Sequence, residues 1–362
     1  MNEPQIHEPK TRVGIVTTLR RAGGAMPTLS RLVTIILLTF IGILVSFLLS
    51  PAQNALMAEG GAVAIAVLGL SWLTGLSGQI SVGNSGFVMV GGYAAAYYAE
   101  HNTTSPVFVS LIIATVFGAL SGLIMGIPGT RLRGPYLAGF TIAFATVLPN
   151  FIQSLSWLGG SGGIFVTPLT SPSWFNSLVG GPYAALDGNA QWTTDFVLVV
   201  AGIAFFFMAN LMRSKTGRAM RLVRDNDVAA ELMGVNLPRA RTLAFVISAS
   251  YSGLAGGLYI LILQSINPSS FQLPFSISLL TVMVLGGIGT LSGAVIAGVI
   301  FAFSGTVVGH LDSWTGINPI SGWGQNLQPI LFGVILIVTM ITAPRGLVGL
   351  GAKIRHLLIR RK

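Results

Sequence analysis

The chain has 362 residues, of which 52% are hydrophobic and only 8% are charged. Soluble domains usually carry about 25% charged residues, so this composition excludes an ordinary soluble domain and indicates that lipid surrounds most of the chain. The sequence contains no cysteine, which excludes disulfides, thiolate metal sites and cysteine nucleophiles.

The basic residues indicate how the chain is oriented in a membrane. All twenty Lys and Arg residues fall within the segments 1–31, 131–133, 213–241 and 345–362. Cytoplasmic loops retain Lys and Arg, so we expect these four segments, and with them both termini, to face the cytosol. The net charge of +10 then belongs to membrane loops, and we expect no nucleic-acid partner.

Apolar runs along the chain predict an all-α integral membrane protein. We expect a polytopic bundle of about 10 (8–10) transmembrane helices, because an even number of crossings of roughly 20 residues each returns the chain to the cytosol. The predicted spans lie near residues 32–50, 61–76, 83–99, 107–128, 136–157, 194–212, 242–264, 274–287, 291–309 and 327–343. The sequence thus divides into a basic N-terminal extension (1–31), a membrane domain (32–344) and a basic C-terminal tail (345–362).

Two glycine-rich junctions separate short predicted spans, LTGLSGQISVGNSG (73–86) and LGGIGTLSG (285–293). Such residues at membrane depth permit broken helices whose free backbone groups line a polar cavity, or else tight packing of small residues. The amides of Gln79 and Asn84 need partners inside a membrane, either a solute or another helix. The candidate translocation residues are Gly75, Gly78, Gln79, Gly83, Asn84, Gly286, Gly287 and Gly289.

No ionisable residue lies well inside any predicted span. Carriers that couple transport to ions usually keep such a residue in the membrane, so its absence argues against proton coupling and, less strongly, against sodium coupling. The P-loop pattern G-x-x-x-x-G-K-[ST] is also absent, which excludes a nucleotide site of that type on this chain. We therefore expect no enzymatic activity, no catalytic residue, no metal and no cofactor.

The segment RSKTGRAMRLVRDNDVAAELMGVNLPRAR (213–241) is unusually polar for this chain. Asp227 is predicted to cap a short helix over residues 228–233, and Gly234 is predicted to close it. Two helical turns are unstable alone in water, so this helix needs a surface to pack against. A docking element for a cytosolic partner explains the pattern, and so does an interfacial loop on anionic lipid headgroups.

Several motifs together resemble the M-type membrane subunit of branched-chain amino acid ABC importers. GRAMRLVRDNDVAAELMGVNLPRARTLAFVISASYSGLAGGLY is similar to that family's coupling loop and following span. GLSGQISVGNSGFVMVGGYAAA resembles its early signature, RLRGPYLAGFTIAF and LGGSGGI its central segments, and VMVLGGIGTLSGAVIAG and APRGLVGL its closing segments. The motifs occur in the family's order between about residues 60 and 350, and in combination they are specific.

The resemblance implies a permease of the inner membrane that imports branched-chain or other hydrophobic amino acids. Its expected partners are a second related permease subunit, two cytosolic ABC ATPases and an external solute-binding protein. The binding protein would face the outer segment 158–193, in which Trp174 and Trp192 could equally anchor the chain at the lipid interface. The residues that would couple to the ATPase are Asp225, Asn226, Asp227, Val228, Ala229, Ala230, Glu231, Leu232 and Gly234.

Alternative functions remain open at this stage. Asn84 stands where many relatives carry a histidine, so the solute could instead be urea, a short amide or another amino acid. An ion-coupled secondary transporter or a passive channel would work without ATPase subunits. A membrane-bound scaffold or receptor would need the basic segment 213–241 but not the glycine junctions.

Overall fold

The computed structural model describes residues 28–102, 106–132, 134–167, 169, 171–172, 175, 184–315, 327–342 and 346–347. Almost all of the predicted terminal segments 1–31 and 345–362, and also Trp174, lie outside these residues. Helices make up most of the described chain, which confirms the all-α prediction. In chain order they are α2 (Thr28–Ser46), α3 (Pro51–Leu70), α4 (Asn84–His101), α5 (Val107–Gly129), α6 (Pro135–Gln153), α8 (Ala184–Leu211), α9 (Lys215–Asp225), α10 (Asp227–Leu232), α11 (Leu237–Leu263), α12 (Leu273–Gly286), α13 (Leu291–Thr315) and α14 (Leu327–Thr342).

The described helices include five that are long and apolar enough to cross a membrane, namely Pro51–Leu76, Val107–Gly129, Pro135–Gln153, Asn189–Leu211 and Leu237–Leu263. Other apolar helices, such as α12, are shorter. These helices are consistent with a multi-pass membrane protein, and the number of about ten crossings stays a prediction.

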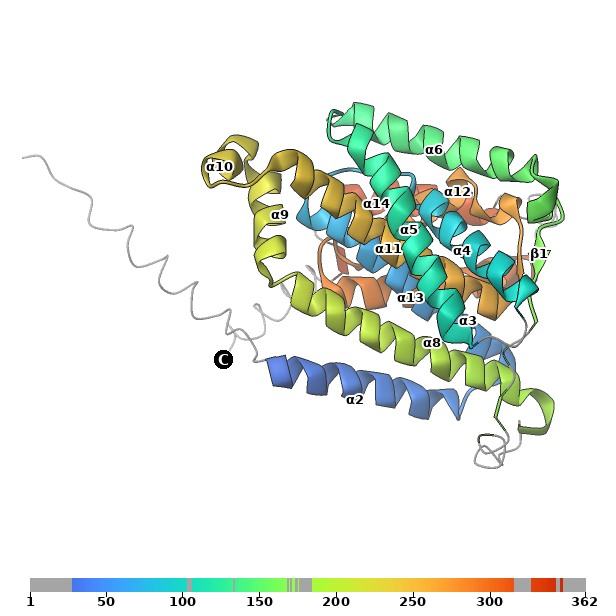
Figure 1. The fold of residues 1–362 in the computed structure, drawn as a ribbon. Helices are drawn as coiled ribbons and strands as arrows, with labels where there is room; N and C mark the ends of the chain where they lie inside the picture. Colours follow the sequence, from blue (N-terminus) through green and yellow to red (C-terminus); the bar gives the residue numbers. More distant parts are fainter. Residues whose placement is uncertain are drawn as a thin grey trace, which may run out of the picture.

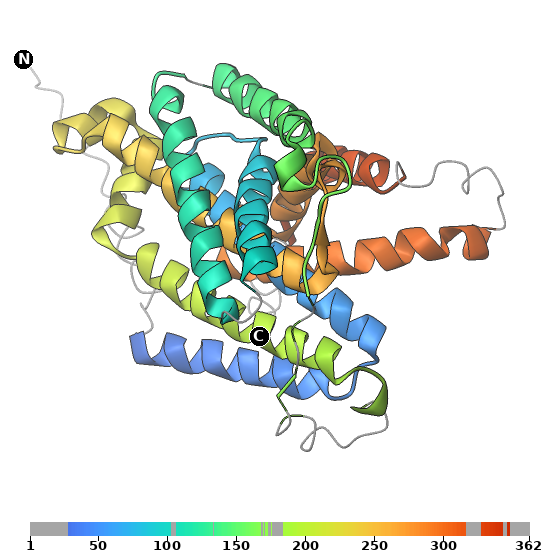
Figure 2. The ribbon, with the colours of Figure 1, turned by 45° about the vertical axis from the view of Figure 1, so that its right-hand side comes forward.

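Helices α3 and α11 form the centre of the bundle, and their packed surfaces supply much of the buried core. Helices α4 and α5 pack against α11, and α13 packs against α3. Helix α2 lies at the periphery against α8, while α6 lies along the opposite side of the molecule (Figures 1 and 2). The short helices α9 and α10 are at one end of the bundle, and strand β1 is at the other (Figure 1).

Helix α3 begins ten residues earlier than the predicted span 61–76. The Ser50 hydroxyl accepts a hydrogen bond from the Gln53 backbone amide, the Gln53 side chain accepts one from the Ser50 amide, and Pro51 occupies the first turn. This capping box fixes the start of the helix. A π-helical turn, η1 (Ser71–Leu76), then continues the helix to Leu76. The first glycine junction (73–86) therefore follows a helix longer than the predicted span, and it comprises the end of η1, a non-helical stretch over residues 77–83 and the start of α4.

Two carboxylates, one half-buried and one buried, lie inside helices, contrary to the expectation for the predicted spans. Glu59 of α3 accepts a hydrogen bond of 2.8 Å from the Tyr259 hydroxyl, and Asp195 of α8 accepts one of 2.6 Å from Ser46. The expectation failed because α3 and α8 both start about ten residues before the apolar runs that predicted them. Both carboxylates have neutral hydroxyl partners within the bundle.

A two-stranded antiparallel sheet joins two connections that are far apart in the sequence. Strand β1 (Ile164–Phe165) pairs with β2 (Ser265–Ile266), with Ile164 opposite Ile266. Gly163, which precedes β1, has φ of +77°, and a Cβ atom there would collide with the Ile266 carbonyl. Glycine is thus required at this point. The sheet ties the α6–α8 connection to the start of the α11–α12 connection, and the sequence patterns did not predict it.

Candidate functional site

The short helix α10 is capped at both ends by its own sequence. The Asn226 side chain accepts a hydrogen bond of 3.1 Å from the Ala229 amide, so Asn226 is the N-cap, and the prediction that Asp227 caps the helix is wrong. At the other end, the Val235 amide donates to the Ala230 carbonyl and the Gly234 amide donates to the Glu231 carbonyl. With φ of +80° at Gly234, this is a complete Schellman motif.

Asp227 has a different role from the predicted one. As the first residue of α10, it forms a 2.6 Å ion pair with Arg241 of α11, and Arg241 also donates to the Thr130 carbonyl after α5. The Ala230 side chain is fully buried against the rest of the protein. Helix α10 is therefore attached to the bundle by one face, through a charge pair and a buried methyl group.

The other face of α10 is apolar and exposed. Val228 is 66% exposed, Leu232 is 84% exposed and the capping residue Met233 is 77% exposed. Val228 and Leu232 are four residues apart and share one side of the helix. Large apolar side chains presented together on a two-turn helix form a small surface suited to a hydrophobic groove. Ala230, which was predicted to belong to a coupling surface, does not face outwards.

The first glycine junction lies against the basic segment. Arg224, near the end of α9, donates a hydrogen bond to the Gly75 carbonyl in η1, and the side chain of Arg224 packs on Gly78, whose φ is +73°. Gln79 donates to the Ser77 hydroxyl at 3.1 Å and more weakly to the Arg241 carbonyl at 3.4 Å. The first glycine junction and the basic segment 213–241, which are more than 120 residues apart in the sequence, thus form one site.

A polar pocket of about 280 Å³ lies between this junction and the basic segment. Its walls include both arginines and the acidic residues around the start of α10. The lining residues are Ser77, Gly78, Gln79, Ile80, Leu132, Gly134, Leu137, Val223, Arg224, Asp225, Asn226, Asp227 and Arg241. The predicted pathway residues Gly78 and Gln79 therefore line the same pocket as Asp225, Asn226 and Asp227, which were predicted to couple to a partner.

The second junction packs directly on the first. A Cβ atom at Gly75 would lie 2.6 Å from both the Cα and the nitrogen of Gly289, so the two backbones meet without side chains between them. Within the second junction, a Cβ atom at Gly286 would collide with the Gly293 carbonyl. Gly287 and Gly289 have φ of +124° and +73°, values that disfavour any other residue. The described contacts of these glycines are backbone packing contacts.

Gly83 and Asn84 lie at the start of α4, next to a buried seam of polar side chains. A Cβ atom at Gly83 would collide with the Thr141 carbonyl of α6. The Asn84 side chain accepts a 2.8 Å hydrogen bond from Ser252 of α11, and the Ser85 amide donates to Ser276 of α12 at 3.2 Å. The members of this polar seam are Asn84, Ser85, Ser248, Ser252 and Ser276, and each is at most 1% exposed.

The polar seam has unused hydrogen-bonding capacity. Asn84 Nδ2, Ser85 Oγ and Ser248 Oγ are buried and have no partner among the described residues. Buried polar atoms are nearly always paired, so these three atoms are candidates for contact with a further polar group. Sequence patterns pointed to Asn84 but missed the serines of α11 and α12, because a lone serine in an apolar helix carries no periodic signal.

Arg224 and Arg241 are the other residues that sequence patterns missed. Both were recognised as basic residues of the segment 213–241, but nothing in their spacing indicated that Arg224 reaches η1 or that Arg241 pairs with Asp227. Because both contacts join residues on different elements, only the packing of α9 and α11 at this end of the bundle reveals them.

Comparison with known proteins matches residues 54–341 to the family described as branched-chain amino acid transport system / permease component. Over 328 residues, the chain is 26% identical to the high-affinity branched-chain amino acid transport system permease protein LivM of Escherichia coli K12, which covers 84% of this chain and 74% of that protein. It is 24% identical over 304 residues to LivH of Salmonella typhimurium LT2, covering 80% of this chain and 92% of that permease. No solved structure matches the chain.

Proposed function

The chain belongs to the branched-chain amino acid transport permease family, and we propose that it is a membrane-spanning subunit of an ATP-binding-cassette importer for branched-chain or related hydrophobic amino acids. The observation that carries this proposal is the family match over residues 54–341, which includes every described helix from α4 to α13. Relatives named LivM and LivH both match the chain, which favours a transporter built from two related permease subunits. The permease moves the solute, and its ATPase partners supply the energy.

In this proposal, α10 is the coupling helix and docks into a groove on the surface of a cytosolic ATPase. The exposed side chains of Val228, Leu232 and Met233 would be buried in this ATPase groove. Burying one large aliphatic side chain contributes about 1.5–3 kcal/mol, so three of them can hold a short helix in place. The Asn226 cap and the Asp227–Arg241 ion pair keep the helix formed before the partner arrives.

Arg224 supplies the connection from the coupling helix to the membrane domain. Its hydrogen bond to the Gly75 carbonyl joins α9 to η1, and Gly75 in turn contacts Gly289 in the second junction. Movement of the ATPase against α10 would therefore press on both glycine junctions. Glycine backbones in direct contact leave no side chains to absorb such a displacement.

The proposed topology places α9 and α10 in the cytosol and β1–β2 on the external side of the inner membrane. Helices α2, α3, α4, α5, α6, α8, α11, α12, α13 and α14 would each cross once, giving ten crossings with both termini in the cytosol. Arg131, between α5 and α6, then lies on the same side as α10. The external segment around Trp192 would receive the solute-binding protein.

The polar seam of Asn84, Ser85, Ser248, Ser252 and Ser276 is the proposed part of the solute path. A branched-chain amino acid is a zwitterion with an apolar side chain, and it needs hydrogen-bonding groups for its charged end within otherwise apolar walls. The unpaired amide and hydroxyl groups of the seam supply such groups without a fixed charge. Gln79 belongs to the coupling region instead, since it contacts Arg241.

Reconstitution into proteoliposomes tests the proposed function. The chain would be assembled with its partner permease and ATPases, and uptake of labelled leucine would be measured with the cognate binding protein outside and ATP inside. We expect uptake only when all components and ATP are present, with competition by isoleucine and valine but not by urea or acetamide. Leucine flux through the purified chain alone would instead establish a channel or secondary transporter.

A further inference from the structure

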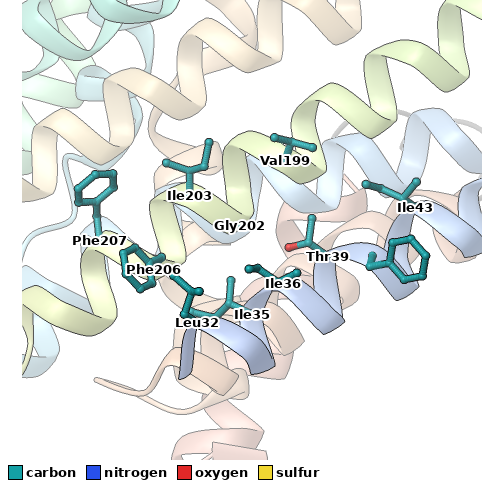
Figure 3. A pocket seen from close by; sticks show the side chains of 11 residues that line it. Leu32, Ile35, Ile36, Thr39, Ile43, Val199, Gly202, Ile203, Phe206 and Phe207 are labelled. Carbon is teal, nitrogen blue, oxygen red and sulfur yellow. The ribbon is translucent and has the colours of Figure 1, made fainter. Parts of the chain in front are cut away.

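An apolar groove of about 490 Å³ runs between α2 and α8, away from the candidate coupling and translocation sites. The side chains that line it come from both helices and are almost entirely hydrocarbon (Figure 3). They belong to Leu32, Ile35, Ile36, Thr39, Phe40, Ile43, Val199, Gly202, Ile203, Phe206 and Phe207. Several of these side chains, such as Ile203 and Phe207, are more than half exposed.

Two contacts hold α2 on α8 and define the groove. At the external end in the proposed topology, Ser46 donates a 2.6 Å hydrogen bond to Asp195. Midway, Thr39 lies so close to Gly202 that a Cβ atom on the glycine would be 2.5 Å from the threonine hydroxyl. These two contacts therefore hold α2 and α8 together and fix the shape of the groove between them.

The size of the groove decides which kind of occupant it fits. From Leu32 to Ile43, α2 advances about 16 Å, so a volume of about 490 Å³ corresponds to a mean cross-section of roughly 30 Å². A transmembrane helix is at least about 10 Å wide with its side chains and has a cross-section of roughly 80 Å². A single hydrocarbon chain fits within the groove, whereas a helix of a partner subunit would lie over it without filling it.

Positive charge gathers at one end of the groove. Arg31 immediately precedes Leu32 at the start of α2, and Arg213 follows the end of α8, beyond Phe206 and Phe207. Because Leu32 and Phe206 lie next to each other in the groove (Figure 3), both arginines are at this end of it. An anionic group at this end of the groove would therefore have two basic side chains nearby.

We propose that the groove holds one acyl chain of an anionic phospholipid whose phosphate lies between Arg31 and Arg213. Hydrocarbon walls and a pair of cations at one end match the two parts of such a lipid, and juxtamembrane Lys and Arg side chains attract anionic headgroups. This proposal depends on the chain being a membrane protein and not on the solute or on ATPase coupling. The site would fasten the peripheral helix α2 to the bundle.

Native mass spectrometry of the detergent-purified full chain tests the headgroup. The protein would be titrated with dioleoyl phosphatidylglycerol and, separately, with dioleoyl phosphatidylcholine. We expect phosphatidylglycerol to bind more tightly than phosphatidylcholine. In the Arg31→Gln, Arg213→Gln double variant, the affinity for phosphatidylglycerol should fall roughly thirtyfold, because two juxtamembrane cations contribute about that much. Arg131→Gln, which removes an exposed cation elsewhere, should leave the affinity unchanged. Equal binding of both lipids, or no loss in the double variant, would overturn the proposal.

A photocrosslinking amino acid at Ile203 tests the groove itself without disturbing the arginines. In native membranes that contain the assembled transporter, we expect a phospholipid adduct, identified by its mass and enriched in phosphatidylglycerol. An adduct to the second permease subunit, or to any other protein, would show that the groove is a protein interface and would contradict the proposal. Either result is independent of whether the transporter is active.

Discussion

Gly75 and Gly139 are helical glycines that differ in the space available for a methyl group. At Gly75 the added carbon would lie 2.6 Å from the backbone of Gly289, whereas at Gly139 nothing lies within 4 Å. We expect Gly75→Ala to destabilise the protein by about 1–3 kcal/mol, as overpacking does. Gly139→Ala should be neutral or stabilising by up to about 1 kcal/mol, because alanine favours helix more than glycine does. Thermal unfolding of both variants in detergent measures the difference, and equal apparent Tm values would refute the proposed junction contact.

Leu232 is the residue at which the docking role of α10 is best tested. Its side chain is 84% exposed, so Leu232→Ser should leave the fold intact and remove about 1.5–3 kcal/mol of burial from the interface. We expect roughly tenfold or greater loss of ATPase affinity, measured by co-purification and by titration with the purified ATPase. Leu263→Ser at the opposite end of α11, where the side chain is 49% exposed, is the matched control. Undiminished affinity in Leu232→Ser would mean that α10 does not enter an ATPase groove.

Individual side chains in the candidate site were only partly predictable. The sequence pattern placed a short helix over residues 228–233, and the structure has it at Asp227–Leu232. It placed the cap at Asp227 and not at Asn226, an error that arose because both residue types cap helices equally well. It also placed Ala230 on the docking surface, since two turns of helix do not reveal which face packs on α9 and α11. The buried position of Ala230 means that a charge there would disrupt the segment itself.

Between elements, the contact from α9 to η1 is the proposed transmission step. Arg224→Met removes the hydrogen bond to Gly75 while keeping the length of the side chain. We expect the ATPase to bind normally, but the amount of solute moved per ATP hydrolysed to fall roughly tenfold, in line with about 1.5–3 kcal/mol for a hydrogen bond from a charged group. Paired measurements of leucine uptake and phosphate release give this ratio.

Arg221→Met provides the control for that experiment. Arg221 lies on the same helix, but among the described residues it donates to carbonyls close to it in the chain, at Gly217 and Met212. Its replacement should leave the ratio of transport to hydrolysis unchanged. If Arg221→Met and Arg224→Met lowered this ratio equally, the charge of the segment would matter and the contact with Gly75 would not.

Helices were the most predictable elements, because each apolar run of suitable length produced one. The errors occurred at helix starts that contain polar residues, as in α3 and α8. For α3 a signal was present, since Ser50, Pro51 and Gln53 form a capping pattern that would have placed Glu59 inside the helix. The β1–β2 pair was not predictable, because two residues per strand give no alternation, and the pairing joins segments about 100 residues apart.

For the whole molecule, the orientation in the membrane is directly testable because the chain has no native cysteine. Single variants Arg131→Cys and Phe165→Cys would place one thiol near each end of the bundle, at exposed positions. In intact spheroplasts, a membrane-impermeant maleimide should label Phe165→Cys but label Arg131→Cys only after permeabilisation. The opposite pattern would invert the proposed topology and place α10 outside.

The broad architecture could be inferred from composition and charge, but the arrangement of the sites could not. Low charge and long apolar runs indicate a helical membrane protein, whereas the cytosolic side indicated by the clustered basic residues stays a prediction. Which helices contact each other depends on side-chain and backbone packing. Glycine contributes to this packing, but its positions in the sequence show no periodicity that would predict the contacts. The meeting of Gly75 with Gly289, more than 200 residues apart, is the clearest case.

Helix α11 runs without interruption from Leu237 to Leu263, a length of about 40 Å. Near its first turn, Arg241 forms an ion pair with Asp227 of α10. Directly beyond its last turn, the chain enters β2. In the proposed topology, a solute-binding protein at β1–β2 and an ATPase at α10 would therefore act on opposite ends of the same helix. Solute delivery and ATP-driven movement would then be coupled along α11, in addition to the contact between Arg224 and Gly75.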